Sequence, residues 1–202
     1  PEPGYRTLNT QDPQHDGLDR ELVAAAQTIN TTLTYPEGIG LKLYADSYYD
    51  FNSHFINLNG TETLQGQVYV NFYTVDASEV KRIARPFLIS NEKINVPPGQ
   101  TVKTTDTWMV PQDLEIIVLS SHTHRHGVHF VITRLNGTPI YQTDDWEDPG
   151  FLMPNPPILL RKGDGLRYTA THYNDDKPYP ITYGLTSEDE IAIIFGYAVP
   201  AE

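Results

Sequence analysis

Cysteine is absent from this chain of 202 residues, and its absence excludes disulfide bonds, thiolate metal ligands and a cysteine nucleophile. Basic residues are scarce as well, because 14 Lys and Arg stand against 26 Asp and Glu, which gives a formal net charge of −12. Nucleic acid and anionic membranes attract basic surfaces, so an acidic chain disfavours both as partners. Cations are therefore the expected ligands.

Long apolar runs are missing too. No stretch of about 18 apolar residues is present, so no membrane span is expected, and no charged n-region with an apolar h-region marks a secretory signal. Hydrophobic residues still make up 39 % of the chain, which is enough for a proper core. Many Tyr, Pro and Gly together with Thr and Val favour short strands joined by turns. The composition therefore predicts an all-β protein.

Period-two alternation of apolar and polar residues recurs from residue 39 onward and predicts a series of strands. Two Asn-Gly pairs, Asn59–Gly60 and Asn136–Gly137, are typical of tight hairpin turns. Only residues 16–29 have apolar side chains at helical spacing, and they predict one short N-terminal helix. Strands without helices between them predict an antiparallel jelly-roll-type β-sandwich. The expected strands are 39–43, 48–58, 67–75, 83–89, 101–109, 114–121, 128–135, 139–143, 158–161, 166–173, 181–185 and 191–199.

Histidines gather directly after the apolar run Leu114–Leu119. His122, His124, His126 and His129 fall within eight positions, and they are four of the seven histidines in the chain. On an extended backbone alternate side chains share a face, so the H-x-H pair His122 and His124 can hold one transition metal ion between two imidazoles. The alternative interpretation is a solvated polar strand end with a bulge or turn at Gly127.

Several motifs in a fixed order accompany this pair. They read Ile94-Asn95-Val96-Pro97-Pro98-Gly99, His122-Thr123-His124, Asp145-Trp146, Lys162-Gly163-Asp164 and Thr186-Ser187-Glu188-Asp189-Glu190. In this order they resemble the C-terminal domain of the copper type II, ascorbate-dependent monooxygenases, the relatives of peptidylglycine α-hydroxylating and dopamine β-monooxygenase, especially their bacterial homologues. Residues 35–40 and 53–55 are similar to the later part of that family's N-terminal domain.

The resemblance implies three regions. Residues 1–35 form an arm with the short helix, 36–92 a partial β-domain, and 93–202 a jelly-roll domain with the H-x-H metal site. It also implies copper as the metal, with ascorbate as reductant where the protein is active, and His54 matches a histidine of the family's second, electron-donating copper site. The expected protein is secreted or periplasmic.

Two departures from the family pattern bear on activity. Ile191 stands where the family has a methionine ligand, and an isoleucine side chain offers no lone pair. His126, His129, His172 or a water is then the expected third ligand, which favours Cu(II) or Zn(II). The second copper site also needs an adjacent His-His pair, which the chain lacks.

Three functions remain open from the sequence. The first is a metal-binding β-sandwich protein that holds copper, or zinc, without hydroxylase activity. The second is a copper-dependent monooxygenase completed by a missing N-terminal half or a partner chain. The third is a metal-free binding or assembly module that retains the sandwich.

Overall fold

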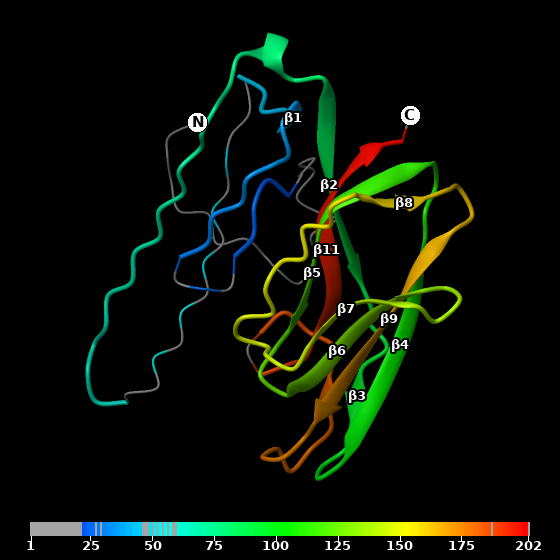
Figure 1. Ribbon diagram of the computed structural model, residues 1–202. Helices are drawn as coiled ribbons and strands as arrows, with labels where there is room; N and C mark the ends of the chain where they lie inside the picture. The colour runs from blue at the N-terminus through cyan, green and yellow to red at the C-terminus, as the bar shows by residue number, and fades with distance from the viewer. Residues whose placement is uncertain are drawn as a thin grey trace.

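The protein, seen in a computed structural model, consists mostly of β-strands arranged in several antiparallel sheets (Figure 1). The structure describes residues 22–26, 28, 30–45, 49, 51, 53, 55, 57, 60–186 and 188–201. One short 3₁₀ helix, η1 (Ala77–Glu79), is the only helical element in this part of the chain. The strands are β1 (Ile39–Leu41), β2 (Arg82–Ser90), β3 (Asn95–Val96), β4 (Thr101–Met109), β5 (Leu114–Thr123), β6 (Gly127–Arg134), β7 (Pro139–Thr143), β8 (Ile158–Leu160), β9 (Gly165–Tyr173), β10 (Ile181–Thr182) and β11 (Ala192–Pro200).

Two sheets enclose the main core. One has the order β1-β2-β11-β5-β8 and the other the order β4-β9-β6-β7, and a small β10-β3 pair forms a third sheet whose Val96 and Ile181 join the same core. Each large sheet contributes one face of alternating apolar residues to a shared cluster, which includes Ile116 and Ile194 from the first sheet and Ile132 and Tyr168 from the second. All strand pairs are antiparallel except β1 with β2.

The outer face of the five-stranded sheet is covered as well. Leu33, Tyr35 and Phe151 pack on buried side chains of β5 and β11, and the Tyr35 ring meets the Tyr197 ring edge-on at 5.3 Å. The Tyr197 hydroxyl donates a 2.7 Å hydrogen bond to the carbonyl of Val23. Because both faces of β5 and β11 are buried, these strands read as nearly continuous apolar runs in the sequence.

Most of the strands after residue 82 follow the sequence prediction. The Asn136–Gly137 hairpin is confirmed, since β6 pairs with β7 and Gly137 adopts a φ of 88° that suits glycine in a tight turn. No helix that could span a membrane is found among the described residues.

Three predictions upstream are wrong. The described residues of the expected helix, 22–26 and 28, are not helical: Leu22 packs beside the apolar cluster of Ile191, Ile193 and Phe195, while Ala24, Ala25 and Ala26 are exposed. Residues 67–75 alternate like a strand but lie unpaired. No strand forms in the described residues of 48–58 either, and His54 lies outside the described residues.

Candidate metal site and the buried carboxylate beside it

The H-x-H pair lies at the end of β5. The rings of His122 and His124 stand side by side with centroids 5.3 Å apart, at an angle of 72°. Both side chains are half-buried. The structure therefore brings these two predicted ligands together, as the alternation of side chains along a strand requires.

Strand β11 runs antiparallel beside this pair. Ile193 is the partner of His122 and Ala192 the partner of Thr123, so the same register places Ile191 opposite His124. The side chain of Ile191 is 4 % exposed and packs in an apolar cluster with Ile193 and Phe195. The position next to the histidines thus carries a hydrocarbon side chain with no ligand atom.

The backbone of the β10–β11 loop fixes the His124 ring. Its Nδ1 lies 2.9 Å from the carbonyl oxygen of Asp189. A carbonyl only accepts, so this contact requires the proton on Nδ1 and leaves a lone pair on Nε2. Such a contact on one ring nitrogen is what orients a histidine that binds metal through the other.

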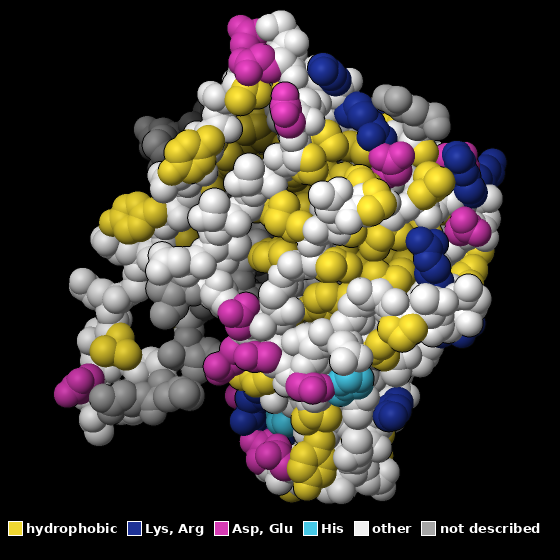
Figure 2. All heavy atoms as spheres, viewed as in Figure 1, with side chains coloured by type: hydrophobic (Ala, Val, Ile, Leu, Met, Phe, Trp, Pro, Cys, Tyr) yellow, Lys and Arg dark blue, Asp and Glu magenta, His cyan; other side chains and the backbone are white. Residues whose placement is uncertain are grey.

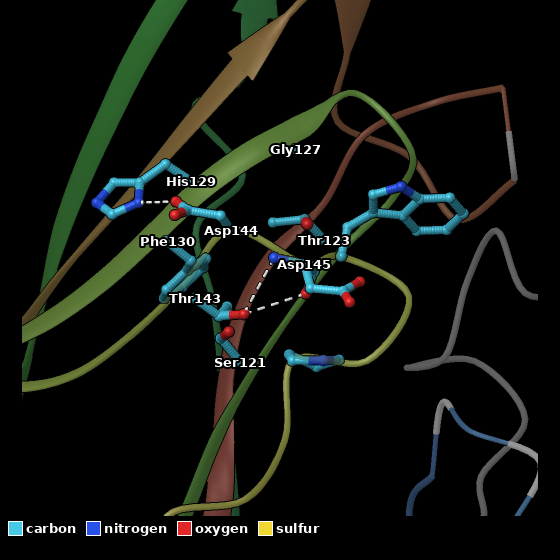
Figure 3. Close-up of a pocket in the computed structure, with 10 residues that line it drawn as sticks. Ser121, Thr123, Gly127, His129, Phe130, Thr143, Asp144 and Asp145 are labelled. Atoms are coloured by element: carbon cyan, nitrogen blue, oxygen red, sulfur yellow. Dashed lines mark hydrogen bonds and ion pairs between the residues drawn. The ribbon is translucent and has the colours of Figure 1, made fainter.

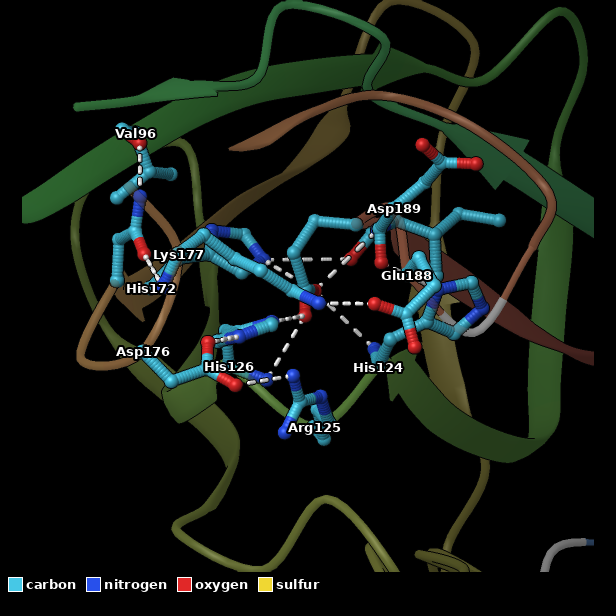
Figure 4. A network of polar contacts seen from close by, with 12 residues as sticks. Val96, His124, Arg125, His126, His172, Asp176, Lys177, Glu188 and Asp189 are labelled. Carbon is cyan, nitrogen blue, oxygen red and sulfur yellow. Dashed lines mark hydrogen bonds and ion pairs between the residues drawn. The ribbon is translucent and has the colours of Figure 1, made fainter. Parts of the chain in front are cut away.

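Glu190 is the centre of a buried polar network at the same strand end, and its side chain is fully buried. The carboxylate accepts hydrogen bonds from the backbone N–H groups of His126 at 2.8 Å and His124 at 3.2 Å. Its oxygens also lie 3.2 Å from Nδ1 of His126 and 3.2 Å from Nε2 of His172. Figure 4 shows His124, His126 and His172 within this network of polar contacts.

The surroundings of Glu190 keep it ionised. Burial alone would raise its pKa, but the hydrogen bond and charge of His172 and the backbone N–H of His126 outweigh burial and lower the pKa. A carboxylate without these partners would be too costly to bury in charged form.

His126 takes part in ion pairs rather than in the H-x-H pair. Its Nε2 lies 2.9 Å from Asp176, whose other oxygen accepts a 2.5 Å hydrogen bond from Arg125. These two hydrogen bonds lower the pKa of Asp176 to about 2. His126, Asp175 and Asp176 hold potential ligand atoms within 4.8 Å of one another. The two oxygens of Asp176 already form ion pairs with Arg125 and His126, so a metal ion would have to displace these contacts.

His172 and His129 lie apart from the pair. His172, on β9, is fully buried with Nε2 against Glu190 and the carbonyl of Ile191. His129 places Nδ1 2.5 Å from Asp144 at a small hollow to which Ser121 and Thr123 also contribute (Figure 3). Ser121 and Thr123 alternate with the H-x-H pair along β5, so this hollow opens on the other side of the strand. Of the third ligands expected from the sequence, His126, His129 and His172 all have other partners, which leaves a water.

The sequence did not indicate the role of Glu190. Residues 188–190 read as a charged turn before a strand, and only the position of Glu190 directly before the apolar run 191–199 hinted at burial. The signal was weak because its partners, the backbone N–H groups of residues 124 and 126, are more than 60 positions away.

Comparison with known proteins adds no relative. No family model matches the chain, and no curated protein sequence matches it. The geometry of the site and the motifs in the sequence are therefore what indicate a function.

Proposed function

We propose that this chain is a metal-binding protein in which His122 and His124 together hold one ion, copper in the first place and zinc in the second. The supporting observation is the pair of adjacent imidazoles at the end of β5, one of which is held by a backbone carbonyl with its Nε2 lone pair left over. Two borderline nitrogen ligands on one strand face suit both metals.

The donor set fits a two-histidine site completed by water. Ile191 supplies no thioether, and His126 and His172 are engaged by Glu190, so soft Cu(I) gains no third protein ligand. Nitrogen and oxygen donors favour Cu(II) or Zn(II). When bound, copper would supply one-electron redox chemistry, and the chain's own residues would hold and orient it.

The finer proposals follow from the resemblance. A jelly-roll β-sandwich fits the two large sheets that share one core. A secreted or periplasmic copper monooxygenase would require ascorbate, a missing N-terminal half or partner chain, and a second copper site to which His54 contributes. The hydrocarbon side chain of Ile191 beside the pair makes this activity the less favoured form of the proposal.

A metal-free binding or assembly module is the second candidate. The observation that favours it is the Glu190 network, which fixes residues 124–126 through backbone and side-chain hydrogen bonds without any ion. In that case the histidines serve the fold alone.

Metal uptake distinguishes the two candidates. The chain is dialysed against Cu(II) or Zn(II), and bound metal is measured by elemental analysis in wild type, in the His122→Ala/His124→Ala variant and in a His129→Ala control. One equivalent in wild type and in the control, lost in the double variant, supports the metal site. Wild-type protein that retains no metal overturns it and favours the module.

A further inference from the structure

A projecting segment of the chain, the described residues of 44–76, is here called the arm, and it exposes an unusual amount of apolar surface. Of the 20 large apolar side chains exposed in the described residues, 11 lie in the arm. Tyr69 and Tyr73 are 79 % and 88 % exposed, and they alternate with Val68, Val70 and Phe72. Soluble monomers rarely present so dense a cluster, which usually marks an interaction surface.

Within the arm, the backbone of residues 63–75 is unpaired as well. Residues 63–75 form no strand, and their N–H and C=O groups make no backbone hydrogen bond with any other described residue. In Figure 1 this stretch runs in extended form at the left, apart from the two large sheets. An extended, unpaired backbone with β-branched and aromatic side chains is a template for pairing with another strand.

Side-chain contacts show that the arm is already folded back on itself. The rings of Tyr49 and Phe72 lie 5.3 Å apart. Phe55 lies six residues after Tyr49, and Gly66 lies six residues before Phe72. The ring of Phe55 lies against Gly66, since a Cβ added at Gly66 would come within 2.5 Å of the Phe55 ring. The two contacts fit one antiparallel register, as in a hairpin; Asn59 of the predicted Asn59–Gly60 turn lies outside the described residues.

We propose that the arm pairs with the arm of a second copy of this chain and makes it a dimer. A single two-stranded hairpin is marginally stable in water, whereas three or more strands with an apolar face are stable. Two arms joined along residues 64–75 give four strands. Pairing would satisfy the backbone groups that face the partner strand in both arms at once, and it would set Val68, Val70 and Phe72 beside apolar side chains of the second copy.

The charge distribution favours a second copy as the occupant. Residues 64–75 carry no charged side chain, although the chain has a net charge of −12. In a two-fold antiparallel pair each strand meets its own sequence, so any charge near the centre would face a like charge. A positively charged partner protein would bind the acidic residues of the chain rather than the uncharged residues 64–75. The arm extends away from the body of the molecule (Figure 2), so pairing through the arms would keep the two acidic bodies apart.

The oligomeric state of the full chain in solution tests this proposal. Sedimentation velocity over a range of concentrations is expected to show a wild-type dimer. Val70→Lys is expected to weaken dimerisation at least about tenfold, because lysine ammonium groups would approach one another across the pair. Val128→Lys, at an exposed position on β6, is the matched control and should dimerise like wild type.

A mixing experiment makes the test specific. Val70→Glu is also expected to be monomeric, and an equimolar mixture of Val70→Lys and Val70→Glu should recover dimer, because opposite charges then meet across the pair. Circular dichroism should show an unchanged body in both variants. A wild type that remains monomeric at every concentration, a Val70→Lys variant that dimerises like wild type, or a mixture that stays monomeric overturns the proposal.

Discussion

Glu190 links the candidate metal site to the stability of the fold. One buried carboxylate accepts backbone N–H groups from the histidine segment and also contacts the rings of His126 and His172. Removal of one member of such a network leaves the others desolvated and unpaired, which costs more than the net value of the individual hydrogen bonds.

Glu190→Gln is therefore expected to lower the free energy of unfolding by about 2–4 kcal/mol, because the amide cannot accept all these hydrogen bonds and has no charge. Urea denaturation measures the loss. Glu188→Gln is the matched control on the same loop, since Glu188 is exposed and pairs with Lys177, and its effect should be much smaller than that of Glu190→Gln. Equal effects of the two substitutions would contradict the central place of Glu190.

The pH dependence of stability follows from the same residue. The pKa of Glu190 is lowered in the folded state, below the value of about 4.3 in an unfolded chain. Ionised Glu190 thus stabilises the fold fully above about pH 4.3, and this contribution is lost as the pH falls through the folded-state pKa. The difference in unfolding free energy between wild type and Glu190→Gln should be constant near neutral pH and shrink in acid. A difference that grows on acidification would mean that the pKa is raised.

At the level of elements, the pairing of β5 with β11 decides what lies next to the histidines. Ile193 faces His122, and the same register brings Ile191 opposite His124. The register therefore sets a hydrocarbon side chain beside the second imidazole, where it offers a metal ion no ligand atom.

Ile191→Met is expected to raise Cu(I) affinity at least about tenfold, because it adds a soft thioether beside the two imidazoles, and to leave Zn(II) affinity nearly unchanged. The volume is similar, so the stability cost should stay below about 1.5 kcal/mol. Competition with a colorimetric Cu(I) chelator measures the affinity, with Ile191→Leu as the control without sulfur. If both variants bind Cu(I) equally, Ile191 does not face the metal.

How far the sequence predicts the elements depends on whether a strand has a local partner. Residues 128–143 were predicted well because alternation and the Asn136–Gly137 turn specify a hairpin within one stretch of chain. Residues 67–75 show the same alternation yet remain unpaired, since a period of two says that a segment fits a sheet and not that a neighbouring strand exists. Residues 22–26 form no helix, and Leu22 packs instead beside the apolar cluster of Ile191, Ile193 and Phe195, a contact that local spacing in the sequence does not reveal.

The H-x-H pair was predictable for a similar reason. Its two histidines share a face through strand periodicity alone, whereas His126 and His172 were candidates whose partners come from distant parts of the chain. Sequence spacing carries no information on such partners, and only the fold shows that Glu190 engages both.

At the scale of the whole molecule, the site lies at one end of a sheet buried on both faces, in a chain with a net charge of −12. The rigid sheet fixes the spacing of the two imidazoles, and the acidic surface attracts cations toward them. The proposed metal ion therefore lies at the end of β5 and has two nitrogen ligands from the protein.

Electron paramagnetic resonance of the Cu(II)-loaded chain tests this central claim most directly. We expect one copper per chain in a tetragonal site with hyperfine coupling to two imidazole nitrogens. Each single variant, His122→Ala and His124→Ala, should lose the coupling to one of the two nitrogens. A spectrum that matches copper in buffer, or one that is unchanged in the His122→Ala/His124→Ala variant, would contradict it.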